Sequence, residues 1–247
     1  VQRTRAFFGE TTPLRRSEAV GGRPYERRPQ QERMAQVTAE TLARHGHLCI
    51  EAPTGVGKTF AYLVPAIYFA ASQNRPVVVS THTISLQEQI LHRDLPVLHE
   101  LIDADFAAAI AKGRSNYVCL RRLEDAAGPH REYLPSNDLV PEIERLVQWS
   151  RQTHDGSLSD LPCEPDHDLW DTVCCEMGNC LNASCPWYRH CFFLRARRRL
   201  SSVQIIVANH ALFFVDLAMK AAPQAPDAGL LPTYAAVVLD EGHMAED

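Results

Sequence analysis

The chain has 247 residues, of which 45% are hydrophobic and 22% charged, and its formal net charge is −5. This composition is typical of a globular protein with one large or two small domains. No apolar run is long enough to span a bilayer and the polar N-terminal residues lack a signal core, so we expect no membrane partner and a cytoplasmic location. The negative net charge argues against a protein that coats nucleic acid by bulk charge, so binding to nucleic acid would need a local basic groove.

Residues 1–29 contain prolines and a glycine pair, which interrupt regular structure, and we expect an irregular leader there. From Gln30 to Arg44, apolar side chains recur at helical spacing, which predicts a helix. The short apolar run His47–Ile50 predicts a strand, on which Cys49 is expected to contribute to core packing.

The segment after this strand reads Glu-Ala-Pro-Thr-Gly-Val-Gly-Lys-Thr from Glu51 to Thr59, and a long apolar helix is predicted from Phe60 to Ala71. Strand, glycine-bearing loop and helix in this order are the context of a Walker A phosphate cradle. Small residues let backbone N–H groups surround the β-phosphate, while a lysine reaches the β- and γ-phosphates and a hydroxyl holds Mg²⁺. Ala52 replaces the first glycine of the usual pattern. The residues expected to bind nucleotide here are Pro53, Thr54, Gly55, Val56, Gly57, Lys58 and Thr59.

Four further apolar runs are predicted as strands, each followed by a polar loop or a helix: Val77–Val79, Phe106–Ala111, Val203–Val207 and Ala235–Leu239. Continuous apolar runs are typical of parallel strands that are buried on both faces. Strand and helix alternate along the chain, so the sequence predicts an α/β fold with a doubly wound parallel sheet.

The last of these strands ends in Asp240 and Glu241, which places both carboxylates at the edge of the sheet where α/β proteins bind ligands. One carboxylate is needed to position Mg²⁺, the role expected for Asp240, and the next polarises the attacking water, the role expected for Glu241. Together with Lys58 and Thr59 in this chain order, the pair indicates hydrolysis of a nucleoside triphosphate.

The alternation of strands and helices stops between Cys119 and Cys191, a range that holds seven of the eight cysteines. In a reducing compartment, such thiols are free or bind metal rather than forming disulfides. One amphipathic helix is predicted from Leu139 to Trp149. Long irregular insertions in compact domains are usually functional or fold separately, so we expect an inserted subdomain pinned by its cysteines.

Two motifs resemble a known family. The run Asp240-Glu241-Gly242-His243 after a P-loop resembles the superfamily 2 helicases, and Cys119 followed by Cys180-x₄-Cys185-x₅-Cys191 resembles the iron–sulfur helicases of the DinG/XPD type, the bacterial DinG-like branch above all. Three shorter segments are similar to the family's entry to the cluster domain, its Asn-His element and its adenine-reading motif: Gly113–Cys119, Ala208–Leu212 and Arg28–Gln31.

The resemblance covers nearly the whole chain and implies a RecA-like P-loop domain, formed by residues 30–118 and 192–247, that is interrupted by a mostly helical iron–sulfur insert at 119–191. By the same resemblance, we expect the family's second motor domain to be absent from this chain. The resemblance also implies that Cys119, Cys180, Cys185 and Cys191 hold a [4Fe–4S] cluster. From the residues alone, four thiolates suit either such a cluster or structural zinc. Cys163, Cys174 and Cys175 are then spare, although Cys174 or Cys175 is an alternative to Cys180 as a ligand.

The resemblance further implies that Arg28 and Gln31 bind the nucleotide, with Gln31 reading the base, and that His243 belongs to the catalytic motif. Thr81, His82 and Thr83 resemble the family's motif Ia, which contacts the DNA backbone. A basic run could line a channel for single-stranded DNA, or it could be the solvated face of a helix. Its members are Arg195, Arg197 and Arg198.

We therefore expect an ATP- and Mg²⁺-dependent DNA helicase that translocates 5′ to 3′ on single-stranded or forked DNA and unwinds duplex in DNA repair or replication, near the bacterial nucleoid. The sequence does not identify which protein partner, if any, recruits the chain. The chain is expected to be the front part of a longer protein or a truncated product that binds ATP and a cluster, hydrolyses slowly and does not unwind. One alternative is a nucleotide- and DNA-binding regulator or redox sensor without unwinding activity. The other is a different P-loop enzyme, such as a kinase, with structural zinc.

Overall fold

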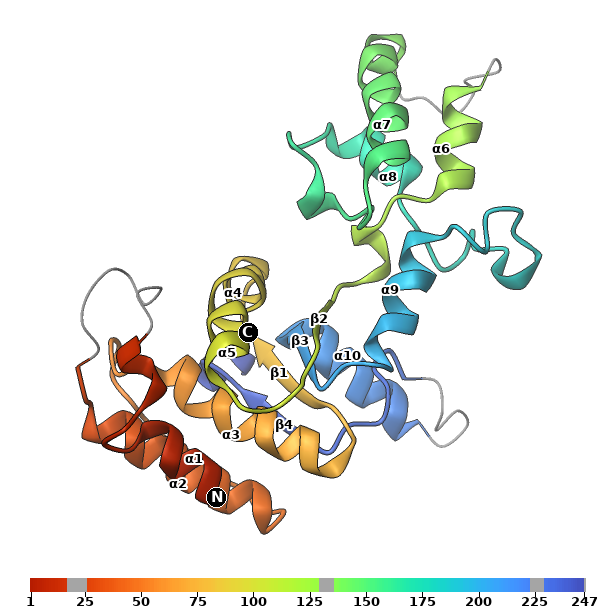
Figure 1. The fold of residues 1–247 in the computed structure, drawn as a ribbon. Helices are drawn as coiled ribbons and strands as arrows, with labels where there is room; N and C mark the ends of the chain where they lie inside the picture. Colours follow the sequence, from red (N-terminus) through yellow and green to blue (C-terminus); the bar gives the residue numbers. More distant parts are fainter. Residues whose placement is uncertain (17–25, 129–135, 223–228, 247) are drawn as a thin grey trace. The chain divides into compact units, whose positions relative to one another are not determined.

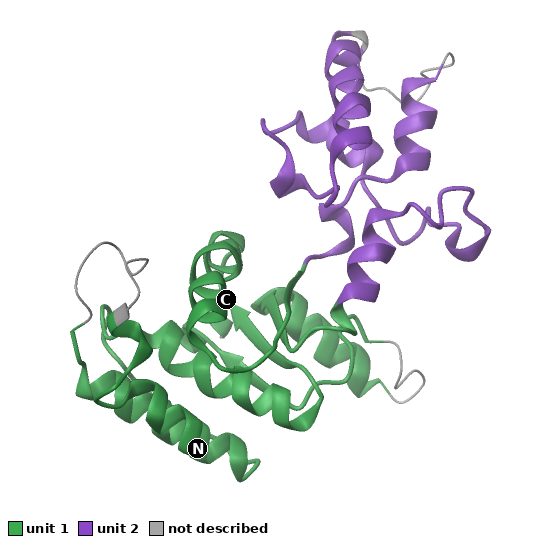
Figure 2. Cartoon of the chain, viewed as in Figure 1, with its two compact units in different colours: residues 1–111, 200–247 green, residues 112–199 purple. Residues whose placement is uncertain are grey.

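The structure is a computed structural model that describes residues 1–16, 26–128, 136–222 and 229–246 (Figure 1). The chain divides into two compact units, which are described separately below (Figure 2). Unit 1 comprises residues 1–111 and 200–247, and unit 2 comprises residues 112–199. Within the described ranges, no helix combines the length and the apolar composition that crossing a bilayer requires.

Unit 1 is built on a parallel sheet whose strand order is β2-β3-β1-β4. The strands are β1 Val77–Thr81, β2 Ala108–Ala111, β3 Ile205–Asn209 and β4 Ala236–Leu239. Val77 of β1 lies opposite Ile205 on one side and Ala236 on the other, so the carboxyl ends of these three strands meet at one edge of the sheet. The predicted α/β fold with a parallel sheet is confirmed.

Side chains alternate between two apolar cores, one on each face of the sheet. Val77 and Val79 face the larger core, while Val78 faces the smaller one. The larger core is covered by helices α1 Gln2–Phe8, α2 Pro29–Ala43, α3 Lys58–Gln73 and α5 Leu95–Leu101. The smaller core is covered by α10 His210–Ala221. A short helix α4 Ile84–Gln89 and a π-helical turn Ile90–Asp94 lead from β1 to α5.

The prediction of an irregular leader over residues 1–29 is wrong for two segments. Residues 2–8 form α1, and Pro13–Arg16 forms a 3₁₀ turn. Phe7, Phe8 and Leu14 are buried in the larger core. Burial of three large apolar side chains stabilises these elements despite the breakers around them. The glycine pair lies in residues 17–25, outside the described residues.

The strand predicted at His47–Ile50 is not formed. These residues have no regular structure, Leu48 is 45% exposed, and Cys49 is exposed rather than in the core. A strand requires a hydrogen-bonded partner, and a short apolar run does not by itself specify one. In the described part of the chain, β4 is therefore an edge strand of the sheet, and the side chains of its Val237 and Leu239 are exposed.

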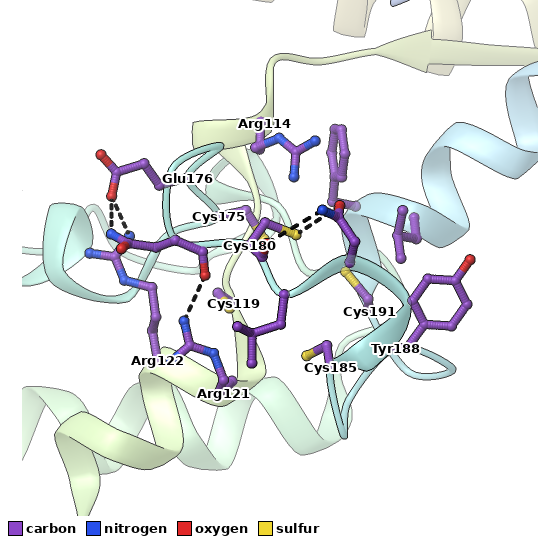
Figure 3. Close-up of a pocket in the computed structure, with 15 residues that line it drawn as sticks. Arg114, Cys119, Arg121, Arg122, Cys175, Glu176, Cys180, Cys185, Tyr188 and Cys191 are labelled. Carbon is purple, nitrogen blue, oxygen red and sulfur yellow. Dashed lines mark hydrogen bonds and ion pairs between the residues drawn. The ribbon is translucent and has the colours of Figure 1, made fainter.

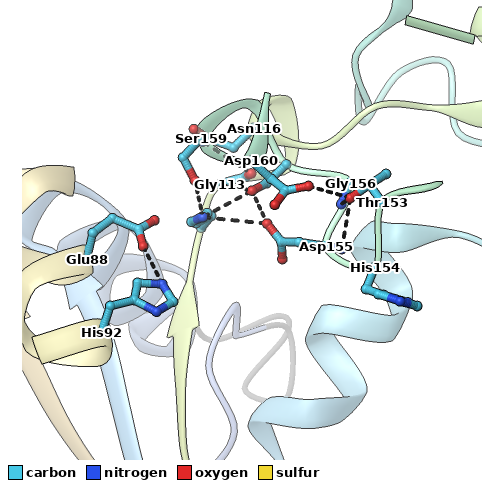
Figure 4. A network of polar contacts seen from close by, with 12 residues as sticks. Glu88, His92, Gly113, Asn116, Thr153, His154, Asp155, Gly156, Ser159 and Asp160 are labelled. Carbon is cyan, nitrogen blue, oxygen red and sulfur yellow. Dashed lines mark hydrogen bonds and ion pairs between the residues drawn. The ribbon is translucent and has the colours of Figure 1, made fainter. Parts of the chain in front are cut away.

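Unit 2 is mostly helical and has a core of its own. Its helices are α6 Leu120–Ala127, α7 Val140–Gln152, α8 His167–Val173 and α9 Phe192–Leu200. The helix predicted at Leu139–Trp149 corresponds to α7. Between α7 and α8, Thr153 donates to Asp160 over 2.5 Å and accepts from the Gly156 N–H over 2.8 Å, which fixes the turn (Figure 4).

Candidate nucleotide site and cysteine pocket

The P-loop runs into the N-terminus of α3, which begins at Lys58. Gly55 and Gly57 have φ angles of 84° and 85°, in the left-handed region that glycine adopts without strain. A Cβ on Gly57 would also collide with the Gln31 side-chain amide. The loop therefore needs glycine at position 57 for two reasons. Its exposed residues are Pro53, Thr54 and Gly55, while Val56 is half-buried.

Arg28 and Gln31 contact this loop directly. Arg28 Nη1 donates to the Gly55 carbonyl oxygen over 2.5 Å, and Gln31 Nε2 donates to the Gly57 carbonyl oxygen over 3.0 Å. Both bonds use carbonyl groups, so they leave the N–H groups of the loop to a phosphate. The structure thus brings the predicted adenine-reading segment onto the back of the predicted phosphate cradle.

The P-loop and the end of β4 meet through Lys58 and Glu241. Lys58 Nζ lies 2.7 Å from Glu241 Oε1, and both side chains are partly exposed. The hydrogen bond from Lys58 lowers the pKa of Glu241 below its usual range. Glu241 has a φ of 52°, a strained conformation for a non-glycine residue of the kind found at functional sites. His243 Nδ1 lies 3.6 Å from Glu241 Oε2, so the second carboxylate oxygen faces this exposed histidine.

Asp240 is held by a residue that the sequence analysis missed. Tyr62 is 2% exposed, and its hydroxyl donates to Asp240 Oδ2 over 3.0 Å. Tyr62 therefore contacts one of the two predicted Mg²⁺ ligands directly. Burial raises the pKa of Asp240, and the bond from Tyr62 opposes that rise. The signal for Tyr62 was its place on α3, one turn beyond Thr59 and on the same helical face.

A second missed contact joins the ends of three strands. The Ser80 hydroxyl lies 2.7 Å from His210 Nδ1, and His210 Nε2 lies 3.0 Å from the Asp240 carbonyl oxygen. A carbonyl oxygen only accepts, so Nε2 carries the ring proton and Nδ1 accepts from Ser80. Burial lowers the pKa of His210, which favours this neutral form. Asn209 of the same Asn-His element caps α10 by accepting from the Leu212 N–H over 2.8 Å.

The residues predicted to contact DNA differ in their availability. Thr81 is fully buried and its hydroxyl donates to the Thr83 carbonyl oxygen over 3.2 Å, so the prediction that its side chain contacts a phosphate is wrong. The reason is that β1, with neighbours on both sides, buries Thr81 at its end. His82 and Thr83 are exposed, and Thr83 also caps α4 by accepting from the Leu86 N–H.

The basic residues of α9 contact partners in unit 2. Arg195 donates to the His154 carbonyl oxygen over 2.5 Å and lies over the ring of Phe192. Arg197 and Arg198 lie over other aromatic rings, at 5.9 and 5.4 Å from the ring centres. These cation–π contacts fix the positions of the guanidinium groups without neutralising their charge.

Five cysteines of unit 2 line one pocket (Figure 3). They come from four places in the chain: the N-cap of α6, the segment after α8, both flanks of a 3₁₀ turn at Asn182–Ser184, and the residue before α9. The five are Cys119, Cys175, Cys180, Cys185 and Cys191. The structure thus brings the four predicted ligands together and adds Cys175, while Cys163 is exposed and Cys174 lies outside the pocket.

The pocket favours ionised thiols at two of these positions. Hydrogen bonding with Cys175 lowers the pKa of Cys119 to about 6 and that of Cys191 to about 6. The same bonds raise the pKa of Cys175, which therefore keeps its proton. Arg121 and Arg122 also line the pocket, and their positive charge suits an anionic ligand.

The sequence of the chain is similar to those of known helicases. The profile of the DEAD/DEAH box helicases matches residues 28–128. The chain is 34% identical over 228 residues to the ATP-dependent DNA helicase YoaA of Escherichia coli K12, which covers 90% of this chain and 34% of YoaA. It is 37% identical over 236 residues to the ATP-dependent DNA helicase DinG of the same strain, which covers 90% of this chain and 32% of DinG. The chain is a homologue of these helicases. The predicted resemblance to the DinG-like branch is confirmed.

This helicase homologue spans about a third of the length of the curated relatives it matches. DinG of Salmonella choleraesuis gives a similar result, with 38% identity over 236 residues. The DinG-like chain therefore corresponds to one part of these proteins, and what their names say of ATP and DNA applies to the whole relatives.

The donor set of the cysteine pocket fits an iron–sulfur cluster. Among the described residues, no three Cys, His, Asp or Glu side chains converge as ligands of a single metal ion. A [4Fe–4S] cluster differs in that each cysteine binds its own iron, so its ligands surround a volume rather than a point. Thiols around one pocket, beside two arginines, are suitable donors for such a cluster.

Proposed function

We propose that the chain is the first RecA-like ATPase domain, with its iron–sulfur insert, of an ATP-dependent DNA helicase. The observation that carries this proposal is the 2.7 Å contact between Lys58 of the P-loop and Glu241 beyond β4, because it joins the two nucleotide motifs in one site. The homologous relatives bear the same activity in their names.

In the proposed site, ATP would lie along the P-loop with its β- and γ-phosphates on Lys58. Thr59 and Asp240 would hold Mg²⁺, and Glu241 would orient the attacking water. The lysine would then exchange its contact with Glu241 for the phosphates, which leaves that carboxylate available to the water. Arg28 and Gln31 would hold the nucleotide from the base side.

The test is to measure ATP binding and ATP turnover on the same preparation of Glu241→Gln. We expect the variant to bind a fluorescent ATP analogue at least as well as the wild type but to lose turnover, because the amide keeps the shape of the side chain and loses its charge. Glu144→Gln on the exposed surface of α7 is the matched control and should change neither quantity. Turnover that survives in Glu241→Gln would contradict the assignment.

We also propose the finer parts of this function. The DNA substrate would be single-stranded or forked, with movement 5′ to 3′ during repair or replication, and the exposed His82 and Thr83 would contact the DNA backbone. DNA-stimulated ATP turnover in the wild type, reduced in a His82→Ala variant, would support this. A chain that binds nucleotide and DNA without such stimulation would instead be a regulatory or redox-sensing module.

The proposed cluster would be held by Cys119, Cys180, Cys185 and Cys191. Its function there would be to fix the loops of unit 2 around one rigid centre. Roughly four iron and four sulfide per chain after anaerobic purification would support a [4Fe–4S] cluster. Zinc instead of iron would refute it while leaving the nucleotide site standing.

A further inference from the structure

The start of helix α3 is joined to the end of β4 by two side chains of the helix. Lys58 Nζ lies 2.7 Å from Glu241 Oε1, and the Tyr62 hydroxyl donates to Asp240 Oδ2 over 3.0 Å. Lys58 and Tyr62 are four residues apart, so they lie on one face of the helix. Thr59, the other expected Mg²⁺ ligand, belongs to the same first turn as Lys58. Both expected ligands therefore lie where α3 and β4 meet.

The donors at this meeting point fit Mg²⁺ bound to a nucleotide. Thr59 offers a hydroxyl and Asp240 a carboxylate, and Mg²⁺ prefers such hard oxygen ligands. The cation usually takes one or two carboxylates together with phosphate oxygens and waters, so a single aspartate beside a P-loop is sufficient. Lys58, which is expected to meet the phosphates, comes directly before Thr59.

The main chain of Asp240 is fixed on both sides of its Cα atom. Its N–H donates to the Ser80 carbonyl oxygen over 2.9 Å, which extends the pairing of β4 with β1. Its carbonyl oxygen lies 3.0 Å from His210 Nε2. Together with the bond from Tyr62 to Oδ2, these contacts give partners within unit 1 to the N–H, the carbonyl group and one carboxylate oxygen. The second carboxylate oxygen, Oδ1, is the one that a cation would take.

Tyr62 can fix this carboxylate because its own position is fixed. Its side chain is 2% exposed, and its ring packs in the larger core of unit 1. The residues next to it on α3, Ala61 and Leu63, are fully buried as well. A buried tyrosine hydroxyl needs a hydrogen-bond partner, and Asp240 Oδ2 provides it. Core packing therefore sets the place of the hydroxyl before any nucleotide binds.

We propose that Tyr62 is a positioning residue for Mg²⁺, which holds Asp240 Oδ2 so that the carboxylate keeps one orientation and Oδ1 binds the cation. This inference rests on the Mg²⁺ role of Asp240 in the proposed function. Hydrogen bonds to metal-binding carboxylates orient them, and the loss of such a partner typically lowers metal affinity by about 10–100-fold. A carboxylate that rotates freely must lose that freedom when the cation binds, whereas one held by Tyr62 has lost it already.

The test compares Tyr62→Phe with wild type, Tyr68→Phe and Asp240→Asn. Binding of a fluorescent, non-hydrolysable ATP analogue is measured in EDTA and then against Mg²⁺ concentration, at a temperature where circular dichroism shows every variant to be folded. We expect Tyr62→Phe to need about 10–100-fold more Mg²⁺ for the half-maximal effect on binding, and to bind the analogue in EDTA as the wild type does. Tyr68→Phe is the matched control, because it removes a hydroxyl from the same helix at a ring that lies beside Arg3.

Two further substitutions at position 62 separate the hydrogen bond from core packing. Incorporation of para-aminophenylalanine keeps the ring and places an N–H donor where the hydroxyl was, so the Mg²⁺ requirement should return toward that of the wild type. Incorporation of para-methylphenylalanine fills the space of the hydroxyl without a donor, so it should behave as Tyr62→Phe and repeats that measurement without a cavity. A role limited to filling the core predicts no difference between these two variants.

Two results would overturn the inference alone. If Asp240→Asn raises the Mg²⁺ requirement and Tyr62→Phe does not, then Tyr62 does not position the carboxylate. If Tyr62→Phe weakens binding of the analogue equally in EDTA and in Mg²⁺, its role is structural. A wild type that does not bind the analogue, or an unchanged Mg²⁺ requirement in both Asp240→Asn and Tyr62→Phe, would instead refute the nucleotide site of the proposed function, and this inference with it.

Discussion

The hydrogen bond between Tyr62 and Asp240 provides a quantitative test of the nucleotide site. Tyr62→Phe removes the hydroxyl that donates to Asp240 Oδ2 over 3.0 Å and leaves the buried ring in place. A hydrogen bond to a charged group contributes about 1.5–3 kcal/mol, and the burial of Tyr62 limits screening by water. For a chain of this size, each kcal/mol shifts the unfolding midpoint by about 2–4 °C, so we expect the midpoint of unit 1 to fall by about 3–12 °C.

The matched control is Tyr68→Phe. Tyr68 lies on the same helix α3, but its ring is half-buried and contacts Arg3 rather than a carboxylate. Calorimetry with and without Mg²⁺ and ATP identifies the transition of unit 1, because ligand binding raises only the midpoint of the unit that binds it. Equal midpoints for Tyr62→Phe and Tyr68→Phe would refute the reasoning.

The stability difference between wild type and Tyr62→Phe should also change with pH in a direction that the pKa of Asp240 determines. Burial raises the pKa of Asp240 in the folded chain above its unfolded value, so ionised Asp240 makes folding less favourable at neutral pH, and this cost disappears as the pH falls through the unfolded value. Tyr62 reduces that cost while Asp240 is charged. The stability difference between wild type and Tyr62→Phe should therefore be larger at pH 7 than near pH 4, where the carboxyl group is increasingly protonated.

Three further variants test other parts of the chain. Lys58→Ala removes the charge expected to meet the phosphates. The loss of a charged hydrogen bond worth about 1.5–3 kcal/mol should weaken ATP binding by about tenfold or more in titration calorimetry. Unchanged affinity would count against the P-loop assignment. Cys185→Ser should lower iron content and visible absorption, whereas Cys163→Ser, on an exposed thiol, should not; equal iron in both would exclude Cys185 as a ligand. Phe8→Ala should destabilise unit 1 by about 3–5 kcal/mol in urea unfolding because Phe8 is 1% exposed, and a loss below about 1 kcal/mol would show that α1 does not anchor the core.

Much of unit 1 could be predicted from local pattern. The apolar runs around Val77 and Ile205 became neighbouring parallel strands, because continuous apolar sequence specifies burial on both faces. The carboxylates after β4 lie beside the P-loop because the carboxyl ends of parallel strands meet at one edge of the sheet. What the local pattern could not specify was the partner of each segment. Thus Leu48 lies in no strand, and α1 depends on a surface for Phe8 that the first residues do not reveal.

The missed site residues share one property. Tyr62 and Asp240 are 178 residues apart in the chain, and Ser80 and His210 are 130 apart, so no spacing rule connects them. The position of Cys175 in the pocket similarly depends on the pairing of Val118 with a distant segment. The number and spacing of the cysteines alone could not distinguish Cys175 from Cys174 as a residue of the pocket.

The hydrogen bonds of His210 have a mechanical consequence. They link a side chain of β1 to the main chain beyond β4, and the residues next to Ser80 lead directly to the exposed His82. A displacement of this loop would stretch the contact of His210 with the Asp240 carbonyl oxygen, and a displacement of Asp240 would pull on the loop. Such a linkage transmits displacement in both directions over a few covalent bonds and two hydrogen bonds, without requiring any change in the shape of the sheet itself.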